Sequence, residues 1–170
     1  LSIDAMGGDD APKIVVDGAA QFLKGRKRAV KLILHGDEAQ IAPLVAQHEG
    51  LADACEIRHS DSEVDMSAKP SEAVRRARGS SMWNAVLAVK EGEAHVAVSA
   101  GNTGALMAIS KVVLRMKKGV HRPAIAASWP APQGFSTVLD VGANVDCSPS
   151  QLVEFAVLGE AFHRAVHGVK

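Results

Sequence analysis

The stretch V-A-V-S-A-G-N-T-G-A-L-M-A, residues 96–108, decides how the rest of the chain is interpreted. Its apolar start, 96–98, predicts a short buried strand, and the apolar run from Ala105 onward predicts a helix. Between them lies a turn of small and polar residues, 99–104. A strand, a small-residue loop and a helix start together aim free backbone N–H groups at an anion. The stretch therefore predicts an anion-binding turn, although a tight strand-to-helix turn with an ordinary cap would have the same pattern.

The polar members of this turn carry groups that bind anions. Ser99, Asn102 and Thr103 bring hydroxyl and amide groups to one place. Gly101 and Gly104 can adopt positive φ angles and leave space for a ligand beside the backbone. Thr103 also suits the N-cap of the helix that follows.

Apolar runs and helical patterns alternate on both sides of this stretch. Strands are predicted at residues 1–5, 30–34, 54–59, 96–98, 124–128 and 137–141. Helices are predicted between most of them, and one more follows the last strand. This alternation predicts a single α/β domain over residues 1–170, a three-layer fold in which a largely parallel sheet has helices on both faces. Both ends look like cuts, so we expect the chain to be part of a longer protein.

Three polar loops that contain glycine follow predicted strands, at 6–10, 99–104 and 142–146. In parallel α/β sheets, ligands bind at the carboxyl ends of the strands. If the three strands are parallel neighbours, the three loops can therefore meet at one edge of the sheet.

Acidic and amide side chains accompany the first and the last of these loops. They are Asp4 and Asp9, which flank Gly7 and Gly8, and then Asp140, Asn144 and Asp146. Asp4 lies in an apolar strand, where an unpartnered carboxylate is costly, so it needs a partner. It either caps a neighbouring loop or orients a cation or a hydroxyl group in the site. No recognised spacing links these acids, so we do not expect a metal ion.

The segment 60–81 is polar and has no strong period. It is either a surface loop or a source of cations and hydrogen-bond donors for phosphate, with Lys69, Ser71, Arg75, Ser80 and Ser81 as the candidates. Ser71 is predicted to cap a short helix, and Ser80 and Ser81 to open a longer one. Basic side chains also cluster within 24–31, 75–78 and 115–122, either as solvated helix ends or as contacts for an acidic partner.

The composition excludes several classes of protein. The chain has 170 residues, of which 47% are hydrophobic and 22% charged, as in ordinary globular domains. Its formal net charge of zero gives no indication of nucleic-acid binding. Cys55 and Cys147 lie far apart and fit a reducing compartment. No apolar run approaches the ~20 residues of a membrane span, and the motifs of a serine-hydrolase elbow and a P-loop do not occur.

Seven short motifs, taken in order, resemble one family closely. They are D-A-M-G-G-D-x-x-P (4–12), K-P-S-x-A-x-R (69–75), S-S-M (80–82), V-K-E-G-E-A (89–94), V-S-A-G-N-T-G-A-L-M-A (98–108), R-P-A-I-A (122–126) and L-D-V-G-A-N (139–144). Each motif alone is weak, but their order is specific, and they are similar to the PlsX-type phosphate acyltransferases. Members of that family are about twice this long, so the chain resembles the N-terminal half.

The resemblance implies an enzyme that moves a fatty acyl group from acyl carrier protein to inorganic phosphate. The acyl phosphate feeds a membrane glycerol-3-phosphate acyltransferase in bacterial phospholipid synthesis. The resemblance also implies a fold similar to the isocitrate/isopropylmalate dehydrogenase and phosphotransacetylase group. A cytoplasmic homodimer is implied as well, with peripheral contact at the inner face of the membrane and neither a cofactor nor a nucleic-acid partner.

Residue roles follow from matching this sequence to the family's motifs. Catalytic roles are predicted for Asn102, Ser99, Lys69 and Asp4. Phosphate contacts are predicted for Gly101, Thr103, Gly104, Ser71, Arg75, Gly7 and Gly8. Asp9, Asp140 and Asn144 are predicted to order the loops.

Two other interpretations fit the same residues. One is a phosphotransacetylase-like enzyme of the same fold group that uses acyl-CoA in place of acyl carrier protein. The other is a phosphate-binding module without catalytic activity in a larger assembly.

Overall fold

The computed structural model describes residues 1–170 except 27–28, 133, 143–145 and 169–170. By its internal contacts the chain divides into two compact units, Leu1–Arg115 and Met116–Lys170, and each is described by itself. The prediction that residues 1–170 form a single domain stays a prediction.

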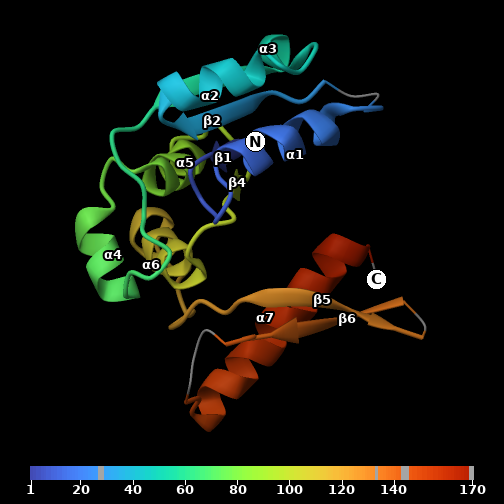
Figure 1. The fold of residues 1–170 in the computed structure, drawn as a ribbon. Coiled ribbons are helices and arrows are strands. Elements are labelled where there is room, and N and C mark those ends of the chain that lie inside the picture. Colours follow the sequence, from blue (N-terminus) through green and yellow to red (C-terminus); the bar gives the residue numbers. More distant parts are fainter. Residues whose placement is uncertain (27–28, 133, 143–145, 169–170) are drawn as a thin grey trace. The chain divides into compact units, whose positions relative to one another are not determined.

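The first unit is built on a four-stranded parallel sheet (Figure 1). Its strands are β1 (Ser2–Asp4), β2 (Leu32–Gly36), β3 (Cys55–His59) and β4 (Ala97–Val98), in the spatial order β3-β2-β1-β4. All three pairings are parallel, which confirms the predicted α/β fold with a parallel sheet. The strands agree in type with the first four predicted ones, with their ends shifted by up to two residues.

Helices cover both faces of this sheet, as predicted. On one face lie α1 (Lys13–Leu23), α2 (Glu38–Val45) and the short α3 (Leu51–Ala54), whose apolar side chains share a core with Leu32 and Leu34. On the other face lies α5 (Ser81–Lys90), and Ile33 packs there with Ala88. Alternate residues of β2 thus enter opposite layers, and each fully buried leucine contributes about 1.5–3 kcal/mol to folding.

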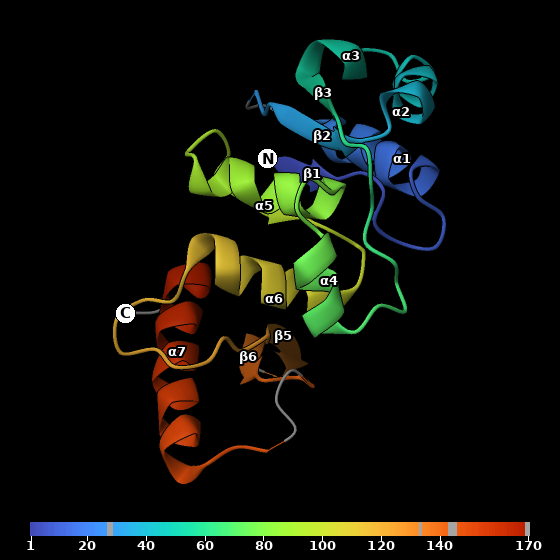
Figure 2. The ribbon, with the colours of Figure 1, turned by 90° about the vertical axis from the view of Figure 1, so that its left-hand side faces the viewer.

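Two further helices pack with α5 in a second core. They are α4 (Pro70–Arg76) and α6 (Thr103–Leu114), and Figure 2 shows them side by side below α5. Met82, Val86 and Ile109 are fully buried at the centre of this core. This core fixes α6, and the turn before it, against the rest of the first unit.

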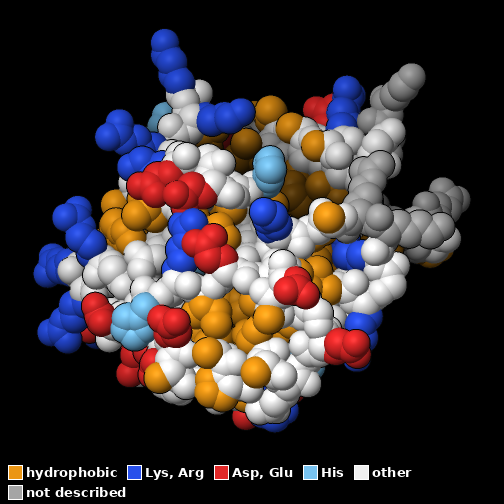
Figure 3. Space-filling model, turned by 90° about the horizontal axis from the view of Figure 1, so that it is seen from above, with side chains coloured by type: hydrophobic (Ala, Val, Ile, Leu, Met, Phe, Trp, Pro, Cys, Tyr) orange, Lys and Arg blue, Asp and Glu red, His pale blue; other side chains and the backbone are white. Residues whose placement is uncertain are grey.

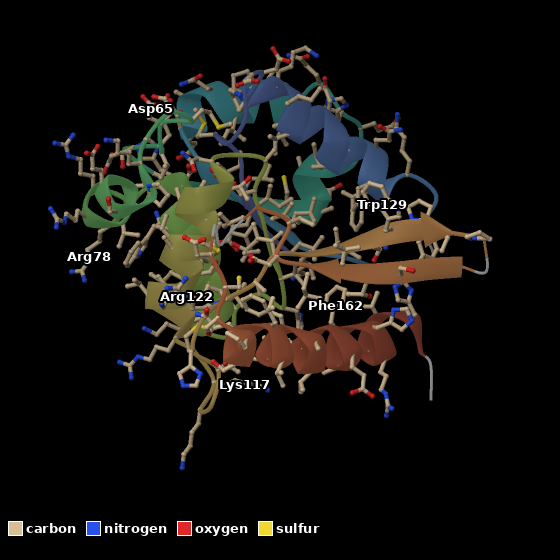
Figure 4. The ribbon with its side chains drawn as sticks, turned by 90° about the horizontal axis from the view of Figure 1, so that it is seen from below. Asp65, Arg78, Lys117, Arg122, Trp129 and Phe162 are labelled. Carbon is tan, nitrogen blue, oxygen red and sulfur yellow. The ribbon has the colours of Figure 1, made fainter. Side chains whose placement is uncertain are left out.

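The second unit is a hairpin packed against one helix. Strands β5 (Ala126–Ala131) and β6 (Gly134–Leu139) pair antiparallel, and α7 (Pro149–His167) packs on β6. The hairpin corresponds to the last two predicted strands, displaced along the chain. Figure 4 labels Trp129 on the hairpin and Phe162 on α7, and their exposed fractions are 65% and 37%.

The helix caps test the sequence reasoning in detail. Ser80 caps α5, which begins at Ser81, as predicted, and Ser148 caps α7 with Pro149 in its first turn. The predicted caps Thr103 and Ser71 are wrong. Asn102 caps α6, and α4 already begins at Pro70, one residue before Ser71, so its N-cap residue is Lys69, whose side chain has no acceptor for a cap.

Among the residues that the structure describes, none of the helices combines the length and the apolar character needed to cross a bilayer. The described His, Cys, Asp and Glu side chains also form no group of three that could hold a metal ion.

Candidate functional site

Two of the three glycine-containing loops meet at the carboxyl edge of the sheet. Strands β1 and β4 are parallel neighbours, with Ile3 opposite Val98. The chain leaves β1 after Asp4 and leaves β4 just before Ser99, so both loops start side by side. The third loop follows β6 in the second unit, where the strand pairing is antiparallel. All three loops were expected to meet only if their strands were parallel neighbours. The third loop does not meet this condition.

Ser99 links the two loops through its hydroxyl group. It donates to Asp4 Oδ2 over 2.7 Å and accepts the Gly101 N–H over 3.1 Å. Asp4 is 2% exposed, and its other oxygen accepts the Met6 N–H over 3.3 Å. The expectation that this carboxyl group needs a partner is confirmed. The Ser99 hydroxyl hydrogen is directed at Asp4, so Ser99 orders the turn, and its predicted catalytic role stays a prediction.

The first loop has glycine where the two loops touch. A methyl group on Gly7 would lie 2.5 Å from Asp4 Oδ2 and 2.8 Å from the Gly101 amide nitrogen. Gly8 has a φ of 113°, a conformation that favours glycine, and it faces Ala100. These glycines allow the close approach of the loops, and phosphate contact by them stays a prediction.

Both the oxygen and the nitrogen of the Asn102 side-chain amide form hydrogen bonds within the protein. Its Oδ1 accepts the Ala105 N–H over 3.0 Å and so caps α6. Its Nδ2 lies 2.9 Å from the carbonyl oxygens of Met66 and Ala68 and 3.3 Å from that of Asp65. A direct catalytic contact by this side chain stays a prediction, and it would require the amide to exchange partners.

The first turn of α6 offers the donors that remain. The first amides of a helix have no acceptor inside the helix, and Asn102 satisfies only that of Ala105. Among the described residues, the N–H groups of Thr103 and Gly104 have no hydrogen-bond partner, and Thr103 is exposed. The positive end of the helix dipole adds to their attraction for an anion.

Lys69 and Ser71 come near this turn through Pro70. A methyl group on Gly104 would lie 2.8 Å from Pro70 Cγ, so the start of α4 rests on the first turn of α6. Lys69, Ser71 and Arg75 are exposed. No described acidic side chain pairs with Lys69 or Arg75. Their predicted contacts with phosphate stay predictions.

Three predicted residues remain, and they are Asp9 in the first loop, Asp140 in the second unit and Asn144. Asp9 is exposed in the first loop. Asp140 lies just after β6 with a φ of 60°, and its N–H donates to the Ile125 carbonyl oxygen over 2.7 Å. Asn144 lies outside the described residues, so its predicted role is open.

Asp140 also perturbs a neighbouring thiol. Cys147 donates its thiol hydrogen to Asp140 Oδ2 with a sulfur–oxygen distance of 3.6 Å. Desolvation, and then this carboxyl group, raise the pKa of the Cys147 thiol above its ordinary value. This contact connects the two sides of the loop that Asp140 was predicted to order.

A buried histidine within strand β2 was not predicted. His35, at 2% exposure, lies 2.9 Å through Nε2 from the Ser2 hydroxyl oxygen, and its Nδ1 has no partner among the described residues. Burial, and then the charge of Arg58, lower the pKa of His35 to about 4. The imidazole is therefore neutral at physiological pH. The apolar pattern of β2 hides it, because a lone histidine carries no pairing signal in a sequence.

Comparison with known proteins identifies the family. The family model described as "fatty acid synthesis protein" matches residues 1–170, the whole chain. The chain belongs to this family. Proteins named phosphate acyltransferase are similar to it. The one from Maricaulis maris is 63% identical over 99% of this chain and 48% of its own length, and the one from Caulobacter vibrioides is 58% identical over 100% and 47%.

The similarity extends to further members, such as the phosphate acyltransferase of Rhodospirillum rubrum, 54% identical over 98% of this chain and 47% of its own. The resemblance predicted from the seven motifs is thereby confirmed. The chain spans about half the length of the curated relatives it matches.

In this member of the fatty acid synthesis protein family, the site divides into two kinds of residue. Asp4, Ser99 and Asn102 use their polar atoms to hold the backbone in place. Thr103 and Gly104 contribute N–H donors without a partner among the described residues, and Lys69 lies at the start of the neighbouring helix α4. The arrangement can hold an oxyanion or a phosphate by backbone donors and a nearby cation.

Proposed function

We propose that this chain carries the phosphate-binding part of an acyltransferase that moves a fatty acyl group from acyl carrier protein to inorganic phosphate. The observation that carries the proposal is the first turn of α6, where the N–H groups of Thr103 and Gly104 have no partner among the described residues and Ser99 and Asn102 hold the backbone in place. The name of the relatives, phosphate acyltransferase, supports the reaction class.

The proposed reaction needs no protein nucleophile. A phosphate oxygen attacks the thioester carbonyl carbon, the carbon–sulfur bond breaks, and the carrier leaves as a thiolate, which gives acyl phosphate. The protein has to hold phosphate against the thioester and stabilise the oxyanion that forms on the carbonyl oxygen. Preorganised N–H donors, with Lys69 offsetting phosphate charge, suit both tasks.

The first test is acyl-phosphate formation from acyl carrier protein thioester and phosphate. It is run with this chain and with a chain extended to the length of the curated relatives. Product in the extended chain supports the proposal, and replacing the carrier thioester by acyl-CoA tests the phosphotransacetylase alternative. Phosphate binding without turnover in the extended chain would favour a module without catalytic activity.

The hydroxyl of Thr103 gives a focused variant. Thr103→Val keeps the side-chain volume and removes one donor, so the KM for phosphate should rise about tenfold, as expected for one hydrogen bond to a charged group. An unchanged KM would remove Thr103 from the phosphate contacts.

A basic surface on α4 fits an acidic carrier protein. Arg75, Arg76 and Arg78 are exposed, and no described acidic side chain pairs with them. Figure 4 shows Arg78 pointing outward, and in Figure 3 basic side chains gather at the edge where α4 lies in Figure 1. Because Arg75 is also a predicted phosphate contact, the test reverses only Arg76 and Arg78, which should raise the KM for the carrier thioester and leave that for phosphate unchanged. Reversing Lys24 and Lys31, also exposed, is the matched control.

The proposal also covers the fate of the acyl phosphate, the oligomeric state and the location of the protein. The acyl phosphate would serve a membrane glycerol-3-phosphate acyltransferase, with the protein acting as a homodimer in the cytoplasm and touching the inner face of the membrane. Sedimentation of the extended chain with and without anionic vesicles tests both the dimer and the membrane contact.

A further inference from the structure

The segment 61–68, between β3 and α4, packs Val64 and Ala68 against the second core but has few hydrogen bonds to the rest of the chain. The Asp65 carboxyl accepts the Ser67 N–H and hydroxyl over 2.6 and 2.7 Å, and the Ala68 N–H donates to the Asp65 carbonyl oxygen, but these bonds lie within the segment. Ser62 pairs with the start of α5 through its carbonyl oxygen, which accepts the Ser81 N–H. Most side chains of the segment are exposed, including Asp65, labelled in Figure 4.

A single side chain from α6 supplies the long-range hydrogen bonds to the rest of this segment. In the part of the chain that the structure describes, residues 63–68 receive them from Asn102 Nδ2, at the carbonyl oxygens of Asp65, Met66 and Ala68. The same side chain caps α6 at Ala105. Asn102 therefore joins two pieces of the site that lie more than 30 residues apart in the sequence.

We propose that Asn102 is a positioning residue that couples phosphate at the start of α6 to the ordering of segment 61–69. This deepens the function proposed above and rests on it. Phosphate held by the amides of Thr103 and Gly104 restricts the turn that carries Asn102. The restricted amide then holds the carbonyl oxygens of Met66 and Ala68 more firmly, which keeps Lys69 beside the anion.

Asparagine is the residue type that this position requires. The side chain must present an acceptor to the helix amide and donors to the carbonyl groups, and one amide provides both. Aspartate would keep the acceptor but lose the donors, and it would place a negative charge against three carbonyl oxygens and the anion. Serine would keep the cap but could not reach the segment with two donors.

The coupling is reciprocal by thermodynamic necessity. If phosphate orders the segment, then an ordered segment must tighten phosphate binding by the same factor. Asn102→Ser should therefore weaken phosphate binding while the fold and the cap of α6 persist. A purely structural role would change stability without making the segment respond to phosphate.

Hydrogen exchange of segment 61–69 tests this coupling in a chain of the relatives' full length. In the parent protein, inorganic phosphate should slow exchange of the segment's amides. In Asn102→Ser, these amides should exchange about tenfold faster without phosphate, as expected when roughly two hydrogen bonds are lost, and saturating phosphate should no longer slow them. Circular dichroism confirms that the variant is folded.

Asn84→Ser is the matched control. It also removes an amide, one that donates to the Ser60 hydroxyl oxygen and the Gly79 carbonyl oxygen, but it does not touch α6. The response of the segment to phosphate should survive in this variant.

Two results would overturn the inference: unchanged exchange without phosphate in Asn102→Ser, or a phosphate response that the variant retains. Parent protein that binds phosphate without any slowing of exchange would also overturn the coupling. Parent protein that does not bind phosphate would overturn the proposed function as well, and the comparison without phosphate would then decide the anchoring role of Asn102 by itself.

Discussion

The Ser99 hydroxyl donates to the carboxyl group of Asp4, 95 positions earlier in the chain, over 2.7 Å. This bond joins the ends of two parallel strands and simultaneously fixes the Gly101 N–H. The bond is partly buried and its Asp4 carboxyl is 2% exposed, so its loss cannot be compensated fully by water. The turn before α6 thus depends on a carboxyl group at the end of β1.

Ser99→Ala should lower the free energy of unfolding by about 1–3 kcal/mol, because it leaves a buried carboxyl oxygen and the Gly101 N–H without their partner. Ser67→Ala is the matched control. It removes a hydroxyl-to-carboxyl bond of the same 2.7 Å length on the exposed surface, and should cost only a few tenths of a kcal/mol. Urea unfolding measures both, and equal losses would show that burial does not distinguish the two bonds.

Gly7→Ala should destabilise the fold by about 1–3 kcal/mol or more, since the new methyl group would approach Asp4 Oδ2 and a backbone nitrogen at 2.5 and 2.8 Å. The control is Gly18→Ala, in α1, where nothing lies within 4 Å of the added methyl group. That change should stabilise the helix by about 0.5–1 kcal/mol. A Gly7→Ala variant as stable as the parent would show that the two loops are further apart than described.

The helices and strands around these contacts could be predicted from the sequence. The apolar runs of β1 and β2, the helical spacing in α1 and the Ser-Pro start of α7 each carry a local signal, because burial and capping act within a few residues. The sequence also contained an indication of the antiparallel hairpin, the short connection between its two strands, which the prediction of a largely parallel sheet did not take into account. Too few residues separate β5 from β6 for the crossover that parallel strands require.

The pairing of polar side chains could not be predicted in this way. The sequence shows that Asp4 needs a partner, but not that Ser99 is the partner, because a pattern lists residues without their distances. The same holds for the amide of Asn102, which reaches carbonyl groups 34 to 37 positions earlier. Every residue has a backbone carbonyl group, so the residue types in a sequence do not indicate which carbonyl group accepts such a bond, and these contacts are found only in a structure.

His35 should make stability fall as the pH is lowered. Its pKa is about 4 in the folded protein against an ordinary value of 6.5 for histidine, so between these values the unfolded chain binds a proton that the folded one does not. The free energy of unfolding should drop by up to about 1.4 kcal/mol per pH unit in this window. The carboxyl groups of Asp17, Asp37 and Glu56 have lowered pKa values, and their effect on stability falls mainly at lower pH than this window.

Urea unfolding at intervals from pH 7 to pH 4.5 measures this slope. His35→Gln keeps a polar side chain beside Ser2 but has no group that titrates, so its slope should be flatter than that of the parent. Parallel curves for the two proteins would assign the pH dependence to other groups.

Asp140 should slow the alkylation of Cys147. Desolvation and the Asp140 carboxyl group raise the pKa of the Cys147 thiol, and a higher pKa leaves less of the reactive thiolate at a given pH. Asp140→Asn removes the negative charge, and asparagine tolerates the φ of 60° at this position. Iodoacetamide labelling at pH 8, followed by mass spectrometry, should therefore be a few-fold faster at Cys147 in the variant.

Cys55 provides the internal control within the same chain. Burial alone raises the pKa of its thiol, so the rate of its labelling should not change in Asp140→Asn. The informative quantity is the ratio of the two labelling rates, because it cancels differences in reagent and in protein concentration. A ratio that is the same in parent and variant would mean that the Asp140 carboxyl does not act on the thiol, and that desolvation by itself sets the reactivity of Cys147.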